Sequence, residues 1–573
     1  MSSEFDLVIR GGKVVDGSGS PARMADVAIR GGVIARVGDV PEKGREEIDA
    51  RGRIVTPGFV DLHTHYDGQV TWEHRLQPSS THGVTTVVTG NCGVGFAPCK
   101  PHQREILVRV MEGVEDVPEV VMTEGVPWEW ETFPEYLQFL EPRRYDIDFA
   151  VQVPHSAVRV YVMGERGEQK VAATEQELRQ MTDIVREAVQ AGAIGVSTSQ
   201  HLGHRANDGT PAPSVVAPPD EVLALARGLR EADAGVFQIV TDGFYGGSDA
   251  STQMALLRNI AQTSGRPLSF TCAQKAPYVK LHDELLQLTQ QAQADGLPIK
   301  AQVFPRPVGF LFGLALSFHP FRFHPSYLEI HHLPVAERAA AMRDPARKKA
   351  ILSETSVNTN PAVVYLVSQY DKAFALSDPV NYEPSPDEFL QAVAKRRGVS
   401  VAEVAYDALL EHDGQGLLLN PATNFAEGNL EAVHRMLTDE NTLVGLGDGG
   451  AHYGMVCDSS YPTTVLAFWT RDRAHGRVPL EWAVNRLTRN NALAVGLTDR
   501  GLLAEGMKAD VNVIDYDRLQ LHPPRPVFDL PAGGCRLTQA ADGYTATIVN
   551  GEVTYRDGQF TGAYPGRLVR RKD

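Results

Sequence analysis

Residues 58–67 read GFVDLHTHYD, an apolar run that ends in a His-x-His pair. His63 and His65 are two residues apart, so in extended backbone their side chains leave the same face and can converge on one metal ion. Pro57 and Gly58 separate this run from a preceding region of short strand patterns. Because the pair directly follows a strand-like run, it predicts a metal site.

Seven further apolar runs alternate with helical patterns, which is typical of βα units around a buried parallel sheet. The full set of runs is 58–62, 84–89, 149–153, 193–197, 235–240, 267–271, 299–304 and 442–446. We expect an α/β fold, a (β/α)8 TIM-like barrel over residues 58–500, with its chemistry at the carboxyl ends of the strands. Thr174 and Glu177 predict a capping box at the start of one of its helices.

The two ends of the chain share a different pattern of short strands and glycine turns, over residues 1–57 and 501–573. Asn550-Gly551 is a strong hairpin dipeptide in the second of these regions. We expect both ends to form one small β-sandwich. The last two barrel runs lie much farther apart than a βα connection requires, which predicts a long insertion at about residues 305–440.

Four histidines gather within this insertion, and they are His319, His324, His331 and His332. Their irregular spacing among prolines favours a lid or interface loop over a second metal site.

Composition restricts the partners of the protein. The 573 residues carry a formal net charge of −16, which favours solubility and disfavours nucleic acid, so we expect a small-molecule amide as the partner. The first residues lack a secretory signal, and no stretch reaches ~18 apolar residues, so we expect a cytoplasmic protein without membrane contact. Five cysteines in a reducing compartment favour free thiols. A homo-oligomer is compatible with this composition.

Two more residues at strand ends complete the predicted site. Cys92 follows the second run in VTTVVTGNCGVG, between Gly90 and Gly93, which permit close backbone approach. A buried free thiol without a metal is the alternative for this cysteine. Asp448 ends the last run in TLVGLGDGGAHYG. A metal activates water and polarises a carbonyl, and one aspartate can move the proton as general base and acid.

These motifs resemble the N-acyl-D-amino-acid deacylases of the amidohydrolase superfamily over nearly the whole chain. The resemblance is carried by GFVDLHTHYD, GNCGVG, Asp448, DRGLLAEGMKADVNVID (499–515) and GAYPGRL (562–568). It implies a barrel with a β-sandwich from both termini and a metal-dependent hydrolase of a non-peptide C–N bond. By resemblance, the metal residues are His63, His65, Cys92 and Asp448, with zinc as the metal.

The chain departs from that family where two more ligand histidines follow the fifth and sixth strands. Val240 and Cys272 stand at or near these positions. Valine cannot ligate a metal, so we expect one zinc ion rather than two, although the thiol of Cys272 could ligate. No lysine follows the fourth strand in STSQ (197–200), which argues against a carbamylated-lysine bridge of the hydantoinase type.

We expect substrate contacts from residues that follow other strands, namely His155, His201 with its neighbour His204, Cys272 and His452. The family's substrate-binding arginine after the last strand is replaced by SSYPTTV (459–465), which weakens the case for an N-acylamino acid. Ring-opening hydrolysis of a cyclic amide or imide is therefore one alternative. A catalytically degenerate barrel that binds a ligand or a partner protein is another.

Overall fold

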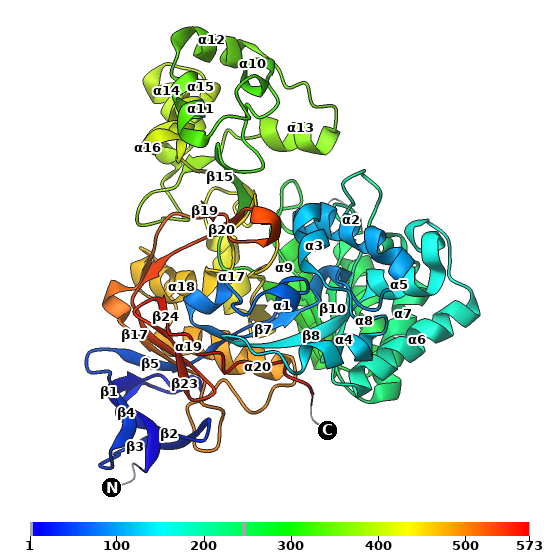
Figure 1. Cartoon of the computed structure of the whole chain (residues 1–573), viewed down its shortest axis with the longest axis vertical. Helices are drawn as coiled ribbons and strands as arrows, with labels where there is room; N and C mark the ends of the chain where they lie inside the picture. The colour runs from blue at the N-terminus through cyan, green and yellow to red at the C-terminus, as the bar shows by residue number, and fades with distance from the viewer. Residues whose placement is uncertain (1–3, 243–247, 572–573) are drawn as a thin grey trace.

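Eight parallel strands follow one another around the centre of the molecule in the order β6-β7-β8-β9-β10-β11-β12-β16 (Figure 1). The computed structural model describes residues 4–242 and 248–571. The strands are β6 (Phe59–Asp61), β7 (Val84–Thr89), β8 (Asp148–Pro154), β9 (Gly195–Ser199), β10 (Val236–Val240), β11 (Leu268–Thr271), β12 (Ile299–Val303) and β16 (Thr442–Val444). Each coincides with one predicted run to within a few residues, so the predicted barrel fold is confirmed.

Helices cover the outside of this sheet. The main ones are α4 (Phe133–Leu140), α6 (Glu175–Gln190), α7 (Pro219–Ala232), α8 (Ala250–Ser264), α9 (Leu281–Ala294) and α17 (Glu431–Thr438). The predicted capping box of α6 is confirmed, because Glu177 N donates to Thr174 Oγ1 and Thr174 N donates to Glu177 Oε2. No helix in the described part of the chain is long and apolar enough to cross a membrane.

The barrel closes between β6 and β16 through a side chain. Among the described residues no backbone ladder pairs these two strands. Asn491, the first residue of α20 (Asn491–Ala494), is fully buried, and its Nδ2 donates to Val60 O at 2.9 Å and to Val444 O at 2.7 Å. One amide group therefore replaces the missing hydrogen bonds across this seam.

A second, nine-stranded sheet is built from both ends of the chain (Figure 1). Its strands are β1 (Phe5–Val14), β2 (Arg23–Arg30), β3 (Val33–Gly38), β4 (Gly44–Asp49), β5 (Ile54–Pro57), β17 (Val511–Ile514), β22 (Tyr544–Val549), β23 (Glu552–Arg556) and β24 (Gln559–Phe560). The two ends join where β5 pairs antiparallel with β17. Buried apolar residues of both ends share one core, which confirms the predicted β domain from the termini.

The region between β12 and β16 carries a separate group of helices at the top of Figure 1. They are α10 (Pro325–Leu328), α11 (Val335–Met342), α12 (Pro345–Ser353), α13 (Pro361–Ser368), α14 (Leu390–Arg397), α15 (Val401–Leu409) and α16 (Glu411–Gly414), above a sheet of β13 (Val308–Phe312), β14 (Phe374–Ala375) and β15 (Leu418–Thr423). His319 is fully buried here against Tyr327, with ring centroids 4.5 Å apart, so it packs in a local core. We keep the predicted insertion bounds, about residues 305–440, as a proposal.

Candidate metal centre

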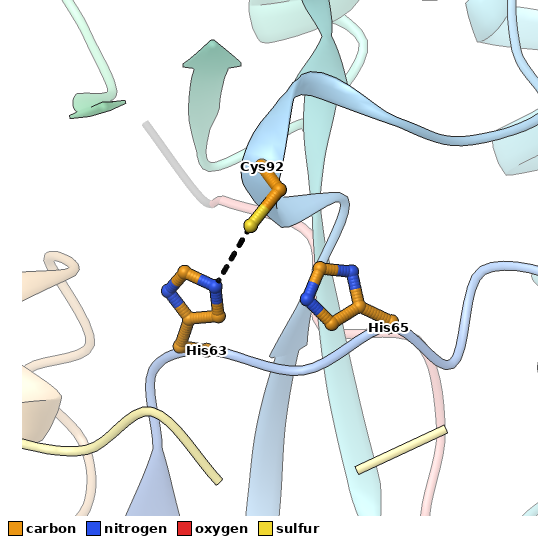
Figure 2. A group of neighbouring side chains, drawn as sticks. All are labelled: His63, His65 and Cys92. Carbon is orange, nitrogen blue, oxygen red and sulfur yellow. Dashed lines mark hydrogen bonds between the residues drawn. The ribbon is translucent and has the colours of Figure 1, made fainter. Parts of the chain in front are cut away.

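His63 and His65 lie on the segment that follows β6, and both are buried. This segment is bound to the loop after β16, because Asp448 N donates to His63 O at 3.0 Å and His65 N donates to Gly449 O at 2.7 Å. In Figure 2 one nitrogen of each imidazole ring turns toward the space beside Cys92. The two-residue spacing thus brings both rings to one point at the barrel mouth, as predicted.

Cys92 reaches this point from the turn after β7. Its backbone is left-handed, with a φ of 54°, and its Sγ lies 3.3 Å from His63 Nε2 (Figure 2). Gly90 is also left-handed, and a Cβ added there would lie 2.3 Å from Gln152 O. The close backbone approach predicted for this glycine is therefore confirmed, and it lets the turn direct the thiol inward.

Asp448 arrives from the third side, on the loop after β16. Its Oδ1 lies 3.6 Å from His63 Nε2 and 3.5 Å from His65 Nε2. The preceding Gly447 leaves no room for a side chain, since a Cβ there would lie 2.1 Å from Asp61 Oδ2. We call His63, His65, Cys92 and Asp448 the donor set.

The spacing of the donor set fits a zinc ion. The donor atoms of His63, His65 and Cys92 all lie within 4.8 Å of one another, and no other such group of three occurs among residues 4–242 and 248–571. Four ligands at ~2.0–2.3 Å around a tetrahedral ion lie roughly 3.3–3.8 Å apart. His63 Nε2 lies 3.3 Å from Cys92 Sγ, and Asp448 Oδ1, which is not in that group of three, lies 3.6 Å from His63 Nε2 and 3.5 Å from His65 Nε2. Two imidazoles, a thiolate and a carboxylate are also ligands that zinc accepts.

Burial makes the metal-free site electrostatically unfavourable for its acidic groups. Burial and the nearby carboxylates of Glu115 and Asp448 raise the pKa of the Cys92 thiol, and burial raises the pKa of Asp448. Burial lowers the pKa of His63 to about 4 and that of His65 to about 3, so both rings are neutral near pH 7. Neutral imidazoles are able to ligate, and a bound divalent cation would favour the ionised thiol and carboxylate.

Two residues beside the donor set were missed by sequence reasoning. Gln302 of β12 lies with Oε1 2.9 Å from His63 Nδ1, and its position as a polar residue inside an apolar strand was the available signal. Glu115 ends α2 (Arg104–Glu115) and is almost fully buried, with Oε1 3.4 Å from His65 Nδ1. Its sequence context reads as the end of an ordinary amphipathic helix, so no local pattern marks it.

Two of the residues predicted to contact substrate, His155 and Cys272, are buried and have partners within the protein. His155 is fully buried, and its ring nitrogens lie 2.7 Å from Thr198 Oγ1 and 2.9 Å from Glu221 Oε1. Cys272 is buried in the core, its backbone N donates to Gln302 O at 2.9 Å, and burial raises the pKa of its thiol to about 12. Substrate contact by His155 and by Cys272 stays a prediction from the sequence.

The other predicted contacts do gather at the mouth. The rings of His201 and His204, in the loop after β9, lie 4.7 Å apart between centroids. Burial lowers the pKa of His204, and positive charge on His201, His452 and both donor histidines would lower it further. His452 lies on the same loop as Asp448.

Residues 46–555 of the chain match the family model described as "Amidohydrolase family". The chain belongs to the amidohydrolase family. D-aminoacylase of Alcaligenes xylosoxydans xylosoxydans is 28% identical to this amidohydrolase over 580 residues, covering 100% of this chain and 98% of the relative. A structure of N-acyl-D-glutamate deacylase from Bordetella bronchiseptica, complexed with zinc and a phosphonate inhibitor, superimposes with a TM-score of 0.65 at 25% identity, covering 99% of this chain and 100% of that chain.

A structure of D-aminoacylase also superimposes with a TM-score of 0.65 at 25% identity, covering 99% of this chain and 100% of that chain. That structure concerns the binuclear metal centre of D-aminoacylase, with activation by one metal and attenuation by a second. Together these findings make this amidohydrolase a metal-dependent hydrolase that acts on carbon–nitrogen bonds other than peptide bonds. The alternative of a degenerate barrel that only binds is not supported.

Proposed function

We propose that this amidohydrolase removes the acyl group from a linear N-acylamino acid or a related small amide, with one zinc ion held by the donor set. The observation that carries this proposal is the group formed by His63, His65 and Cys92, whose donor atoms all lie within 4.8 Å of one another, with Asp448 Oδ1 3.6 and 3.5 Å from the two imidazole rings. The names of the relatives, D-aminoacylase and N-acyl-D-glutamate deacylase, supply the substrate class.

Asp448 is the proposed general base and acid. When bound, the zinc ion polarises the amide carbonyl and lowers the pKa of the attacking water. Asp448 Oδ1 lies within 3.6 Å of both imidazole Nε2 atoms, so it is adjacent to the reacting centre. It can accept the proton of the water and deliver it to the departing nitrogen.

The opposite side of the mouth favours one ion over two. Val240 ends β10 with an apolar side chain, and Cys272 does not belong to any group of donors in the described chain. The D-aminoacylase relative is described by activation through one metal and attenuation through a second. A single-ion site in this chain is thus compatible with the chemistry of its family.

Two cationic side chains, Arg306 and Lys275, are candidates for binding an anionic group of the substrate. Arg306 is buried, and its guanidinium donates to Asp458 Oδ1 at 2.8 Å, to Ser460 Oγ at 3.0 Å and to Cys457 O, so it is engaged within the protein. Lys275 follows β11 and is partly buried, and its charge contributes to lowering the pKa of His201. We propose that Lys275 favours an anionic group on the substrate, with His201, His204 and His452 lining the same mouth.

The five cysteines are all free thiols in the structure. This agrees with a proposed cytoplasmic enzyme, in which reducing conditions keep thiols available as ligands.

Metal analysis combined with a substrate panel tests the proposal. Purified protein should contain one zinc ion per chain, lose activity on dialysis against a chelator and regain it with one equivalent of zinc. The panel compares N-acetyl-D-amino acids, their L-isomers, the corresponding carboxamides and cyclic imides. We expect the linear carboxylates to be hydrolysed fastest. Faster turnover of cyclic imides would shift the function to ring opening, and hydrolysis that survives complete metal removal would overturn the proposal.

A further inference from the structure

We propose that Glu115 is the positioning residue of this centre, with one carboxylate oxygen orienting His65 toward the metal and the other orienting His452 toward the substrate. The inference rests on the proposed function, because it takes His65 as a metal ligand. Glu115 belongs to no motif of the sequence and reaches the site from α2, between β7 and β8. It acts through two imidazole rings and does not contact the reacting atoms itself.

The first contact fixes the orientation of His65. Its Nε2 faces Asp448 Oδ1 at 3.5 Å, whereas its Nδ1, on the other edge of the ring, faces Glu115 Oε1 at 3.4 Å. Both Nδ1 and Oε1 are buried and have no hydrogen-bond partner among the residues that the structure describes. An imidazole that ligates through Nε2 carries its proton on Nδ1, and a carboxylate is the usual acceptor for that proton. A closer approach of a few tenths of an ångström satisfies both atoms at once.

The second contact involves His452 on the loop after β16. Glu115 Oε2 lies 3.5 Å from His452 Nε2, and His452 N donates to Glu115 O. The backbone of His452 is left-handed, with a φ of 53°, so this ring is held in an unusual conformation. When Nε2–H faces the carboxylate, Nδ1 becomes an acceptor, and this Nδ1 has no partner within the described chain. His452 is then prepared to accept a hydrogen bond from a substrate N–H.

The fold holds Glu115 firmly in this place. Asp116, with a φ of 51°, turns the chain at the end of α2, and its Oδ2 accepts from Gly454 N at 3.0 Å. Glu115 and Asp116 thus bind the same loop, but only Glu115 touches imidazole rings. Burial and the nearby carboxylates of Asp448 and Asp67 raise the pKa of Glu115 well above its ordinary value. A buried carboxylate needs strong hydrogen-bond donors, and in this proposal the N–H groups of the two rings serve as those donors. Glu115 Oε1 approaches Nδ1 of His65, on the ring edge opposite the Nε2 that faces Asp448, so Glu115 orients a donor and is not itself one.

The test compares Glu115→Ala with the matched control Asp116→Asn, which perturbs the loop anchor without touching His65. Zinc affinity is measured by competition with a chelator on metal-free protein, and the cobalt-substituted proteins are examined for the thiolate charge-transfer band of Cys92. We expect Glu115→Ala to lose roughly 10–100-fold in zinc affinity with the band retained, as for other residues that orient metal-binding histidines. Asp116→Asn should stay within about 3-fold of the parent, a shift below ~0.7 kcal/mol.

Steady-state kinetics distinguish the contact of Glu115 with His65 from its contact with His452. At saturating zinc, Glu115→Ala should raise KM to a similar extent as His452→Ala, whereas His452→Ala should leave zinc affinity unchanged. Equal losses of affinity in the Glu115 and Asp116 variants would reduce the role to loop anchoring and overturn the proposal. Disappearance or displacement of the cobalt band in Glu115→Ala would overturn it in favour of direct ligation. Failure of the parent protein to bind zinc would instead refute the proposed function.

Discussion

The two halves of the barrel mouth differ sharply in what their strand ends carry. Strands β7, β6 and β16 form the donor half, because His63, His65, Cys92 and Asp448 follow their carboxyl ends. Strands β8, β9, β10 and β11 form the opposite half, where His155 is tied to Thr198 and Glu221, and Val240 and Cys272 lie in apolar packing. The same fold position therefore has a different role in each half.

Backbone conformation follows the same division. Cys92, Asp448 and His452 all adopt left-handed backbone, with φ values of 54°, 46° and 53°. For residues other than glycine this conformation costs about 1 kcal/mol or more, and it clusters at functional sites. A position at the carboxyl end of a barrel strand is therefore insufficient to identify a metal-binding residue. The turn that aims the side chain, and the partners that already occupy it, decide its role.

Removing the carboxylate from the donor half should have the largest effect. Asp448→Asn should lower kcat by roughly 10²–10⁴-fold, because a neutral amide cannot accept the proton of the attacking water. The matched variant on the opposite half is Asp242→Asn, whose carboxylate follows β10 and accepts from Ser248 N and Oγ at 3.0 and 2.8 Å. It should stay within a few-fold of the parent in the same assay. Comparable losses in both variants would erase the distinction between the halves.

Thiols provide the next comparison. Cys92→Ala should weaken zinc binding by at least ~10-fold, because it removes a donor 3.3 Å from His63 Nε2. Cys272→Ala should leave zinc affinity and kcat/KM within about 2-fold, since its thiol contacts no donor. Chelator competition on the two purified variants provides the measurement. A loss of zinc affinity in Cys272→Ala would show that the opposite half does contribute a ligand.

His155 should matter for stability and little for catalysis. His155→Ala removes both ring contacts, at 2.7 and 2.9 Å, and leaves Glu221 with Arg159 as its remaining strong partner. We expect a loss of about 1–3 kcal/mol in the free energy of unfolding. Urea denaturation measures this loss, and KM at saturating zinc serves as its control. A large rise in KM without loss of stability would instead support the substrate contact predicted from the sequence.

The pH dependence of the metal-free protein should be a smaller effect, and it comes from the donor half. The pKa of His63 is about 4 and that of His65 about 3 in the folded protein, because both rings are buried. In the unfolded chain both take up protons below about pH 6.5, so stability is present above that pH and is lost as the pH falls toward 4. Replacing both histidines by asparagine should flatten this slope by up to about 1.4 kcal/mol per pH unit for each ring. Urea unfolding at a series of pH values checks it, and an unchanged slope would contradict the assignment.

Much of the fold was predictable because its signals are local and periodic. The eight strands are apolar runs, the capping box of α6 needs only Thr174 and Glu177, and Asn550-Gly551 forms its turn with φ values of 50° and 82°. The sequence patterns at residues 6–9 and 13–15 predict two short strands, but these residues form the single strand β1, with a register irregularity between Ile9 and Gly12. Pattern alone does not distinguish such an irregular strand from two short ones.

The donor residues were predictable by motif, whereas their surroundings were not. Glu115 comes from a helix inserted between β7 and β8, and its approach to His65 depends on tertiary packing. His155 follows a barrel strand, as a functional residue would. Its Nε2, however, hydrogen-bonds to Glu221, which is 66 residues away in sequence. Long-range partners of this kind leave no trace in local sequence.

The donor set lies across the junction between β6 and β16, where the barrel closes. His63 and His65 follow one edge strand and Asp448 follows the other, while the side chain of Asn491 hydrogen-bonds to both strands. An ion bound by the proposed donor set would connect the two sides of this seam, so that metal affinity and closure of the barrel would be thermodynamically linked. Removal of the ion would weaken this connection. The backbone amide protons of β6 and β16 would then exchange with solvent faster than those of the opposite half.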